Sequence, residues 1–461
     1  MQRGMRVALA GAAAWIVLGL GLDVAAQGLD GEAARRLQGA LAVQAATRAH
    51  LRLLGDATTC ADARFVSYRR SDKEPDVVDQ WYVASQLWAD AQLTATASGA
   101  PTPPTRTPTR SPTPLTRTPT PTPTRPPTPD ELEARCHLDK GFIFLDRLWD
   151  YSTGGYYPLS DPSGTAVVRG VRYSDDNALA GLSLLAAAAS QSDPLLRQRY
   201  LHAARREAEF LTESGLWDGT FGGGFWWTTN KGDTPEGKPA HTNALAALFF
   251  ARLHNATNLE ADRAWALRTL LWLDTILYDP SKRLYRWSVG YQDREARLGA
   301  ILSERYFNYD QGIAIEAQTL AARLDGDPNR LPRARGVGEA LHEAFWGREL
   351  GGYNLEAGIE QVYTAFAAWT SLGHLALHDA DGDARWLDLA RRNADALTAS
   401  LRGVDGAYAQ RHYRCVDRRA PGCESVVFKW AFDQTRDTAA QAWIQHLQTA
   451  IARRTAPPRL P

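Results

Sequence analysis

The chain has 461 residues, which is ample for a large hydrophobic core. Its 52 Lys and Arg balance its 52 Asp and Glu, so the formal net charge is zero. This balance lacks the basic excess that marks nucleic-acid-binding proteins, and no nucleic-acid partner is expected.

The first 26 residues read as a signal peptide. Two arginines precede an apolar run over residues 7–22, and small residues ending at Ala26 form a cleavage site before Gln27. The apolar run is short for a membrane span, and no second one follows. We therefore expect a secreted or cell-envelope protein with no membrane span after cleavage; an uncleaved anchor is the alternative.

Residues 99–129 are almost entirely Thr, Pro and Arg. Such a tract cannot bury apolar surface and should be extended and disordered. The segment before it holds two amphipathic helices, expected over 31–55 and 77–97, which is little for an independent core. Because the entropic cost of a loop rises slowly with its length, we predict a disordered loop insertion within a single domain of residues 27–461, and not a linker between two domains.

Helical periodicity dominates the rest of the chain, which brings the predicted helices to twelve. One set is rich in Ala and other small apolar residues: 175–190, 240–256, 309–325, 360–378 and 433–453. The other set is amphipathic: 131–149, 194–213, 260–278, 332–347 and 383–400. Helices that are apolar all round are buried, whereas amphipathic ones face solvent. The alternation predicts an all-α fold, an (α/α)6 toroid of six helical hairpins; a helical solenoid would show a fixed-period repeat, which we do not find.

Asp175 and Asp176 lie side by side at the start of the first apolar helix after the tract. Adjacent carboxylates repel each other, so one can stay protonated while the other is ionised. Such a pair can cleave a glycosidic bond. Helix capping by Asp is the simpler explanation of an isolated pair.

Other inner-helix starts carry similar residues. In a toroid of this kind the inner helices run in one direction, so their N-terminal ends converge on one face. Capping explains single Asp or Asn residues there, but not the repeated aromatic and Gln residues. A Gly-rich loop also presents two tryptophans, of which at least one should stack on a sugar; the alternative is that both are packing residues. We therefore expect substrate contacts from Tyr173, Trp226, Trp227, His241, Asn243, Tyr309, Asp310, Gln311 and Tyr363.

The chain has four cysteines. Because we expect it to be exported, an even number of cysteines favours disulfides. Cys60 and Cys136 flank the Thr/Pro tract close to two outer helices, so we predict a bridge between them. Cys415 and Cys423 could close a small loop. No Cys or His cluster has metal-ligand spacing, so neither a metal nor a cofactor is expected.

Three motifs resemble glycoside hydrolase family 76, the endo-α-1,6-mannanase family: YSDDNALAGL from residue 173, GGGFWW from 222 followed by TNALAAL from 242, and YFNYDQG from 306. The resemblance spans about 31–455. It implies a retaining glycosidase that acts as a monomer on α-1,6-linked mannan or a related α-glycan. It also implies that Asp175 is the nucleophile and Asp176 the general acid/base, although the residues alone do not assign these roles.

Two other readings remain open. A sugar epimerase or unsaturated-uronyl hydrolase could use the same toroid, but such epimerases are expected to use a pair of histidines, and only His241 lies at an inner-helix start. A non-catalytic glycan-binding or cell-wall protein could also have this fold. The intact Asp pair argues against that reading.

Overall fold

The computed structural model describes residues 31–97, 129–414 and 430–456, apart from positions 56, 58, 65 and 233. The predicted signal peptide, the Thr/Pro tract up to residue 128 and the Cys415–Cys423 pair lie outside the described residues. The single-domain organisation across these segments remains a prediction. Among the helices of the described ranges, none combines the length and apolar character needed to cross a bilayer.

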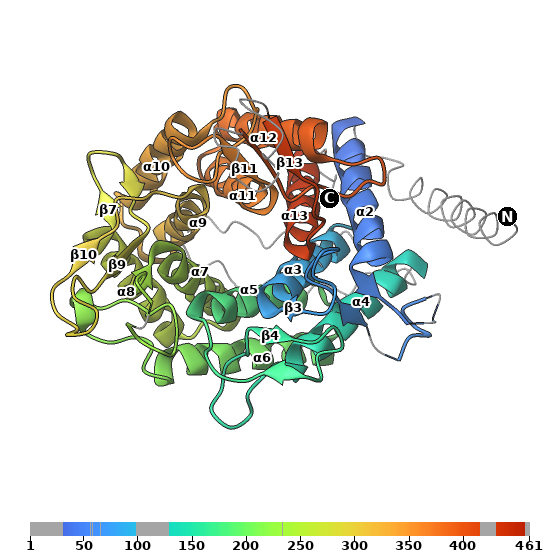
Figure 1. The fold of residues 1–461 in the computed structure, drawn as a ribbon, viewed down its shortest axis with the longest axis horizontal. Coiled ribbons are helices and arrows are strands. Elements are labelled where there is room, and N and C mark those ends of the chain that lie inside the picture. The colour runs from blue at the N-terminus through green and yellow to red at the C-terminus, as the bar shows by residue number, and fades with distance from the viewer. Residues whose placement is uncertain are drawn as a thin grey trace, which may run out of the picture.

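Twelve α-helices of the described chain form two concentric rings (Figure 1). The inner ring consists of α3 (Gln80–Ala97), α5 (Ser174–Ser190), α7 (Ala240–Thr257), α9 (Asn308–Asp325), α11 (Thr364–Asp381) and α13 (Thr438–Thr455). The outer ring consists of α2 (Gly31–His50), α4 (Pro129–Arg147), α6 (Pro194–Glu213), α8 (Glu260–Ile276), α10 (Arg330–Phe345) and α12 (Ala384–Leu401). Each inner helix packs against the next, and α13 returns to α3 to close the circle. The predicted (α/α)6 toroid is confirmed.

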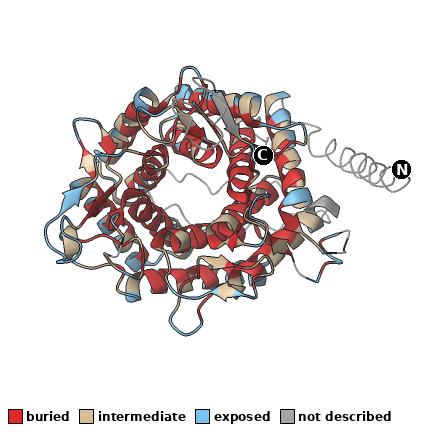
Figure 2. Cartoon of the chain, in the orientation of Figure 1, coloured by how far each residue is buried: buried red, intermediate tan, exposed pale blue. Residues whose placement is uncertain are grey.

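The inner helices are buried along nearly their whole length, whereas the outer helices bury one face (Figure 2). Small residues permit this density. A Cβ atom added to Gly373 of α11 would lie 2.7 Å from the backbone oxygen of Gly312 in α9. That obstacle is backbone and cannot rotate away, so the Ala and Gly content of the inner helices reflects close helix approach.

The connections differ at the two ends of the toroid. Four described loops that lead from an inner to an outer helix are short: 191–193, 258–259, 326–329 and 382–383. The connection from α3 to α4 holds the Thr/Pro tract, so the tract joins the toroid at the end opposite the inner-helix starts. Loops that lead into an inner helix are long and carry short strands.

These strands pair antiparallel and join neighbouring loops. One three-stranded sheet has the order β3 (Val78–Asp79), β4 (Leu159–Ser160), β5 (Val167–Val168). The second has the order β10 (Ile301–Leu302), β9 (Ser288–Gly290), β6 (Lys238–Pro239), and the third has β11 (Gln361–Tyr363), β12 (Arg411–Arg414), β13 (Trp430–Asp433). Two pairs complete the set: β1 (Arg52–Leu53) with β2 (Ser67–Tyr68), and β7 (Tyr278–Asp279) with β8 (Leu284–Tyr285).

Four inner helices hold the preceding loop by the same device, which we call the amide clamp. The fourth residue of the helix is Asn or Gln, and its side chain bonds both the N–H and the C=O of one buried aromatic residue in the loop. The clamps are Asn177 on Tyr156, Asn243 on Phe225, Gln311 on Tyr285 and Gln441 on Tyr408. Each clamp satisfies backbone groups that burial would otherwise leave without partners.

Helix α11 has Ala367 at the fourth position, and the outer helix supplies the amide instead. Asn393 of α12 accepts from the backbone N–H of Tyr353 at 3.3 Å and donates to the carbonyl of Ala367 at 2.8 Å. The side chain thus reaches the place that a clamp residue on α11 would occupy.

Two buried links hold the first helices to the ring. The predicted Cys60–Cys136 disulfide is present and joins the loop after β1 to α4, across a sequence separation of 76 residues. In the chain-entropy picture a closed loop of this length stabilises the fold by about 4–5 kcal/mol. The second link is an ion pair between Arg52 and Asp90, which are 0% and 2% exposed.

Three glutamine side chains also form hydrogen bonds to the aspartate of this ion pair. Gln44 of α2, Gln86 of α3 and Gln445 of α13 each donate to the same oxygen of Asp90 at 2.9–3.0 Å. Asp90 therefore lies where the first and last helices of the described chain meet α3.

Candidate active site

The start of α5 is fixed to the Gly-rich loop that precedes α7. The backbone N–H of Ser174 donates to the carbonyl of Trp227 at 2.8 Å, and its hydroxyl donates to the carbonyl of Trp226 at 2.7 Å. These bonds set the first turn of α5, and with it the Asp pair, against the loop that carries both tryptophans.

Asp175 has a partner for each carboxylate oxygen. The indole N–H of Trp227 donates to Oδ1 at 3.0 Å, and His241 Nε2 lies 3.2 Å from Oδ2. The residue is 6% exposed. A carboxylate that only capped its helix would instead accept from backbone N–H groups of the first turn, so capping does not explain Asp175.

Asp176 has a different environment. Its side chain is partly exposed, and its carbonyl accepts from the Gln80 side chain at 3.1 Å. Loss of hydration, together with the negative charges of Asp175 and Asp79, raises the pKa of Asp176 well above its usual range, against the opposing effect of His241. The two adjacent carboxyls are therefore distinguished: Asp175 is held by two side-chain partners, while the raised pKa of Asp176 favours its protonated form.

His241 bridges two carboxylates from different helices. Its Nδ1 lies 3.3 Å from Oδ1 of Asp310 on α9, in ion-pair range but without hydrogen-bond geometry. Burial lowers the pKa of His241, but Asp175 and Asp310 outweigh it and raise the pKa to about 9. Burial raises the pKa of Asp310 to about 6, although His241 opposes this shift.

A belt of rings continues from this charged group. Tyr173 lies 5.5 Å from Trp227, measured between ring centroids, and His241 lies 5.4 Å from Tyr309. Phe366 then packs on Tyr309 at 4.6 Å and on Tyr363 at 5.4 Å. Tyr173, Trp227, Tyr309 and Tyr363 are partly exposed and belong to this chain of ring contacts; their role as substrate contacts stays a prediction.

Four of the nine expected sugar contacts have other roles. Asp310 is fully buried beside His241, and the other three help to build the loops. Trp226 is 2% exposed, donates from its indole N–H to Asp218 at 2.7 Å, and packs beneath Lys238. Asn243 and Gln311 are fully buried and act as amide clamps. These three side chains are buried and hold the loops around the Asp pair, which corrects their assignment as substrate contacts. Of the two tryptophans, Trp227 is the one that bonds to Asp175.

The start of α3 belongs to the same site, although the sequence analysis assigned no site residue there. Asp79 acts on the charge of Asp176, and Gln80 bonds its backbone. Deeper in the ring, Trp369 lies 5.4 Å from Trp81 and stacks on Trp443 at 4.2 Å. Asp79 and Gln80 lie at the start of the inner helix α3, so the expectation that inner-helix starts share one face also covers them.

Two cavities stand out in the described structure. A cavity of about 230 Å³ opens beside the starts of α3 and α13. Its lining includes Tyr82, the buried Asp437 and Arg70, which pairs with Asp79. Its lining mixes charged side chains of both signs with hydroxyl groups, and Arg70 connects it to Asp79, whose charge acts on Asp176.

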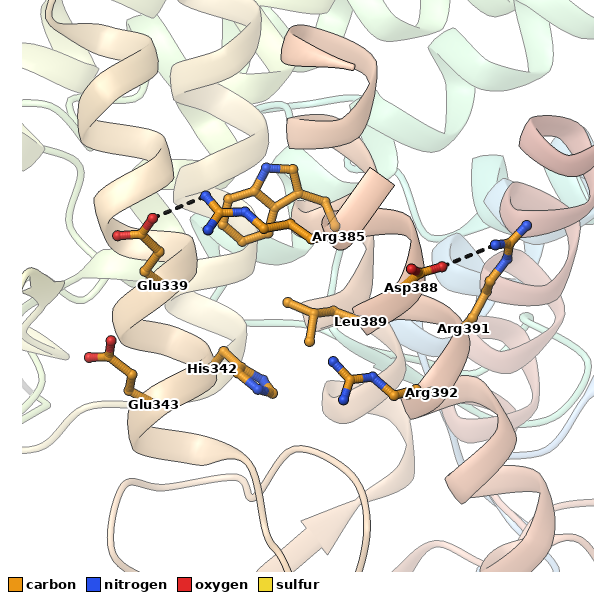
Figure 3. Close-up of a pocket in the computed structure, with 9 residues that line it drawn as sticks. Glu339, His342, Glu343, Arg385, Asp388, Leu389, Arg391 and Arg392 are labelled. Carbon is orange, nitrogen blue, oxygen red and sulfur yellow. Dashed lines mark hydrogen bonds and ion pairs between the residues drawn. The ribbon is translucent and has the colours of Figure 1, made fainter. Parts of the chain in front are cut away.

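The larger cavity, about 680 Å³, lies on the outside of the toroid between α10 and α12 (Figure 3). Its charged side chains largely pair with each other, as Glu339 does with Arg385 at 3.0 Å and Asp388 with Arg391 at 3.1 Å. Trp386 is buried and offers no free ring face. None of its lining residues belongs to the helix starts that carry the Asp pair and its partners.

No group of three or more His, Cys, Asp or Glu side chains in the described ranges is arranged to hold a metal ion.

The (α/α)6 fold and the paired carboxylates are compatible with a glycoside hydrolase. Residues 165–373 match the sequence model of glycosyl hydrolase family 76, so the resemblance to this family is confirmed for that part of the chain, which contains the Asp pair, the Gly-rich loop and the α9 motif. A comparison with curated proteins gave no match.

Solved structures share the fold. A family 76 mannosidase from Bacteroides thetaiotaomicron is 17% identical, with a TM-score of 0.63 over 91% of this chain and 99% of its own. An inactive variant of a Salegentibacter α-1,6-mannanase, in complex with α-1,6-mannotetrose, is 18% identical, with a TM-score of 0.61 over 90% and 98%. A sugar epimerase from a ruminal bacterium is 13% identical, with a TM-score of 0.59 over 82% and 88%. The fold is thus common to hydrolases and epimerases, and the activity has to be argued from the site.

Proposed function

We propose that this protein is an exported, retaining glycoside hydrolase that cleaves α-1,6-linked mannan or a related α-glycan. The observation that carries the proposal is the difference in environment between the two members of the Asp pair. Asp175 lies between the indole N–H of Trp227 and the imidazole of His241, while the pKa of Asp176 is raised. One ionised and one protonated carboxyl at the same helix start are the two groups that a retaining glycosidase requires.

The reaction then proceeds in two displacements. The Asp175 carboxylate attacks the anomeric carbon, and the bond from that carbon to the glycosidic oxygen breaks as Asp176 gives its proton to the departing oxygen. A glycosyl ester on Asp175 results. Asp176, now ionised, takes a proton from water, and the resulting hydroxide equivalent attacks the anomeric carbon and releases the Asp175 carboxylate.

The choice of mannan rests on the relatives. The Salegentibacter α-1,6-mannanase was inactivated by replacing two consecutive aspartates and holds an α-1,6-linked mannose oligomer. The corresponding feature here is the consecutive pair Asp175 and Asp176 within the family match.

The proposal predicts that the purified protein releases reducing ends from linear α-1,6-mannan. The first sugar product should have the α configuration, because retention requires two inversions. Proton NMR of the fresh reaction distinguishes the anomers before they interconvert. A β first product would exclude the retaining mechanism, and a reducing sugar converted without any bond cleavage would favour an epimerase. Binding without turnover would favour the non-catalytic reading.

A matched pair of tryptophan variants tests the proposed site. Trp227→Phe keeps an aromatic ring but removes the indole N–H that donates a hydrogen bond to Asp175. Since a hydrogen bond to a charged group contributes about 1.5–3 kcal/mol, we expect kcat to fall about 10- to 100-fold. Trp226→Phe should lower the thermal midpoint and leave kcat of the folded protein nearly unchanged, because Trp226 bonds to Asp218 away from the pair. Equal effects of the two changes on kcat would contradict the placement.

A further inference from the structure

We propose that His241 and Asp310 form a charged dyad that positions Asp175 and balances its charge during the reaction, an inference that rests on the hydrolase function proposed above. The imidazole lies between two carboxylates, 3.2 Å from Asp175 and 3.3 Å from Asp310. The three residues come from the first turns of α5, α7 and α9. Three helices thus converge on one alternating row of charges.

Asp310 has no route to a substrate. It is fully buried, and neither of its oxygens has a hydrogen-bond partner among the described residues. A buried carboxylate is costly unless a cation compensates it, and His241 is the cation in contact with it. His241 is itself 6% exposed, with Trp227 and Tyr309 packed on its ring. The dyad therefore acts through Asp175 and not through contact with sugar.

The surrounding groups define the charge state. The titratable side chains that face His241 are Asp175 and Asp176 from α5 and Tyr309 and Asp310 from α9. With a pKa of about 6 for Asp310 and about 9 for His241, the carboxylate and the imidazolium coexist between these values. Because burial raises the pKa of Tyr309 well above its usual range, the phenol stays neutral there.

This arrangement has a use in both steps of the reaction. Before attack, the imidazolium lies against Oδ2 of Asp175 and holds it in place. In the ester intermediate Asp175 carries no charge, and without Asp310 the buried imidazolium would lose its adjacent counter-ion. Asp310 keeps His241 protonated through that stage, so the cation is already in place when the Asp175 carboxylate is released. His241 and Asp310 are thus positioning residues.

The decisive measurement follows the proton on His241, independently of any substrate. In protein labelled with ¹⁵N-histidine, the His241 signals are assigned by their loss in His241→Gln and then titrated. We expect a wild-type midpoint near pH 9. In Asp310→Asn the midpoint should fall by at least about one pH unit, because one of the two carboxylates is gone. Glu207→Gln removes another fully buried carboxyl, on α6, and should leave the midpoint unchanged.

A neutral His241 at pH 7 in the wild-type protein would overturn the proposal, and so would a midpoint that Asp310→Asn does not move. The wild-type titration decides even if Asp310→Asn fails to fold. Kinetics give a second reading: in His241→Gln kcat should fall, because Oδ2 of Asp175 loses the imidazole that holds it in place. If no glycan is cleaved, the hydrolase proposal fails while the titration still reports on the dyad.

Discussion

Replacing either carboxyl of the pair should abolish most activity and leave the fold intact. Asp176→Asn removes the proton donor, and general acid–base catalysis contributes about 10²- to 10⁴-fold. Asp175→Asn removes the nucleophile, so the loss should be at least as large. Asn is close to Asp in size and is also favoured at helix starts, so the thermal midpoints should stay near that of the wild type. Initial rates on α-1,6-mannan and thermal unfolding measure the two effects separately.

The chain offers a control for helix capping. Asp193 is a true cap, since its side chain accepts from the backbone N–H of Leu195 at 2.8 Å at the start of the outer helix α6. Asp193→Ala should cost about 1 kcal/mol of stability and leave kcat unchanged. If the variants of the pair behaved like Asp193→Ala, with full activity, Asp175 and Asp176 would be structural and the proposed mechanism would be refuted.

The second large effect is expected in stability. Asp90→Ala leaves the buried Arg52 guanidinium without its counter-charge and removes the acceptor shared by three glutamines. Loss of one partner of a buried ion pair costs about 3–5 kcal/mol, a large part of the stability of a typical domain. Urea unfolding of the disulfide-intact protein measures the change in the free energy of unfolding.

Asp395→Ala is the matched surface control. Its carboxylate pairs with Arg36 at 2.7 Å, but its side chain is 68% exposed. A pair of this kind contributes at most about 1 kcal/mol. Replacing both partners, as in Arg52→Met with Asp90→Leu, should recover much of the loss because no charge remains buried. If Asp90→Ala cost no more than Asp395→Ala, the link between the first and last helices would have little energetic weight.

The fold could be predicted because the burial of each helix determines the pattern of apolar residues in its sequence. Inner helices are apolar all round and outer helices on one side, and the predicted helices correspond one to one with those in the described ranges. The larger boundary errors have a common cause. Helices expected from 360 and 433 begin at Thr364 and Thr438, because β11 occupies Gln361–Tyr363 and β13 extends to Asp433. Strands of three or four residues are too short to show an alternating pattern.

The site was predictable where chemistry constrains the residue type. Adjacent carboxyls at a helix start were recognisable, and the rule of converging inner helices also placed His241 and Asp310 nearby. Asn243 and Gln311 were misassigned because an amide in a first turn looks the same whether it faces a ligand or a loop. The backbone groups they bind are 18 and 26 residues away along the chain, and no local pattern reports such contacts.

The amide clamps have a consequence for how the loops before the inner helices can vary in length. From the clamped aromatic residue to the clamp, the chain runs 18 residues before α7, 21 before α5, 26 before α9 and 33 before α13. The anchor points are the same although the lengths nearly double. Segment length is thus uncoupled from the geometry of the ring, and a longer segment costs little extra entropy. The loop between the two anchor points can therefore be exchanged or extended while the helices beneath it remain as they are.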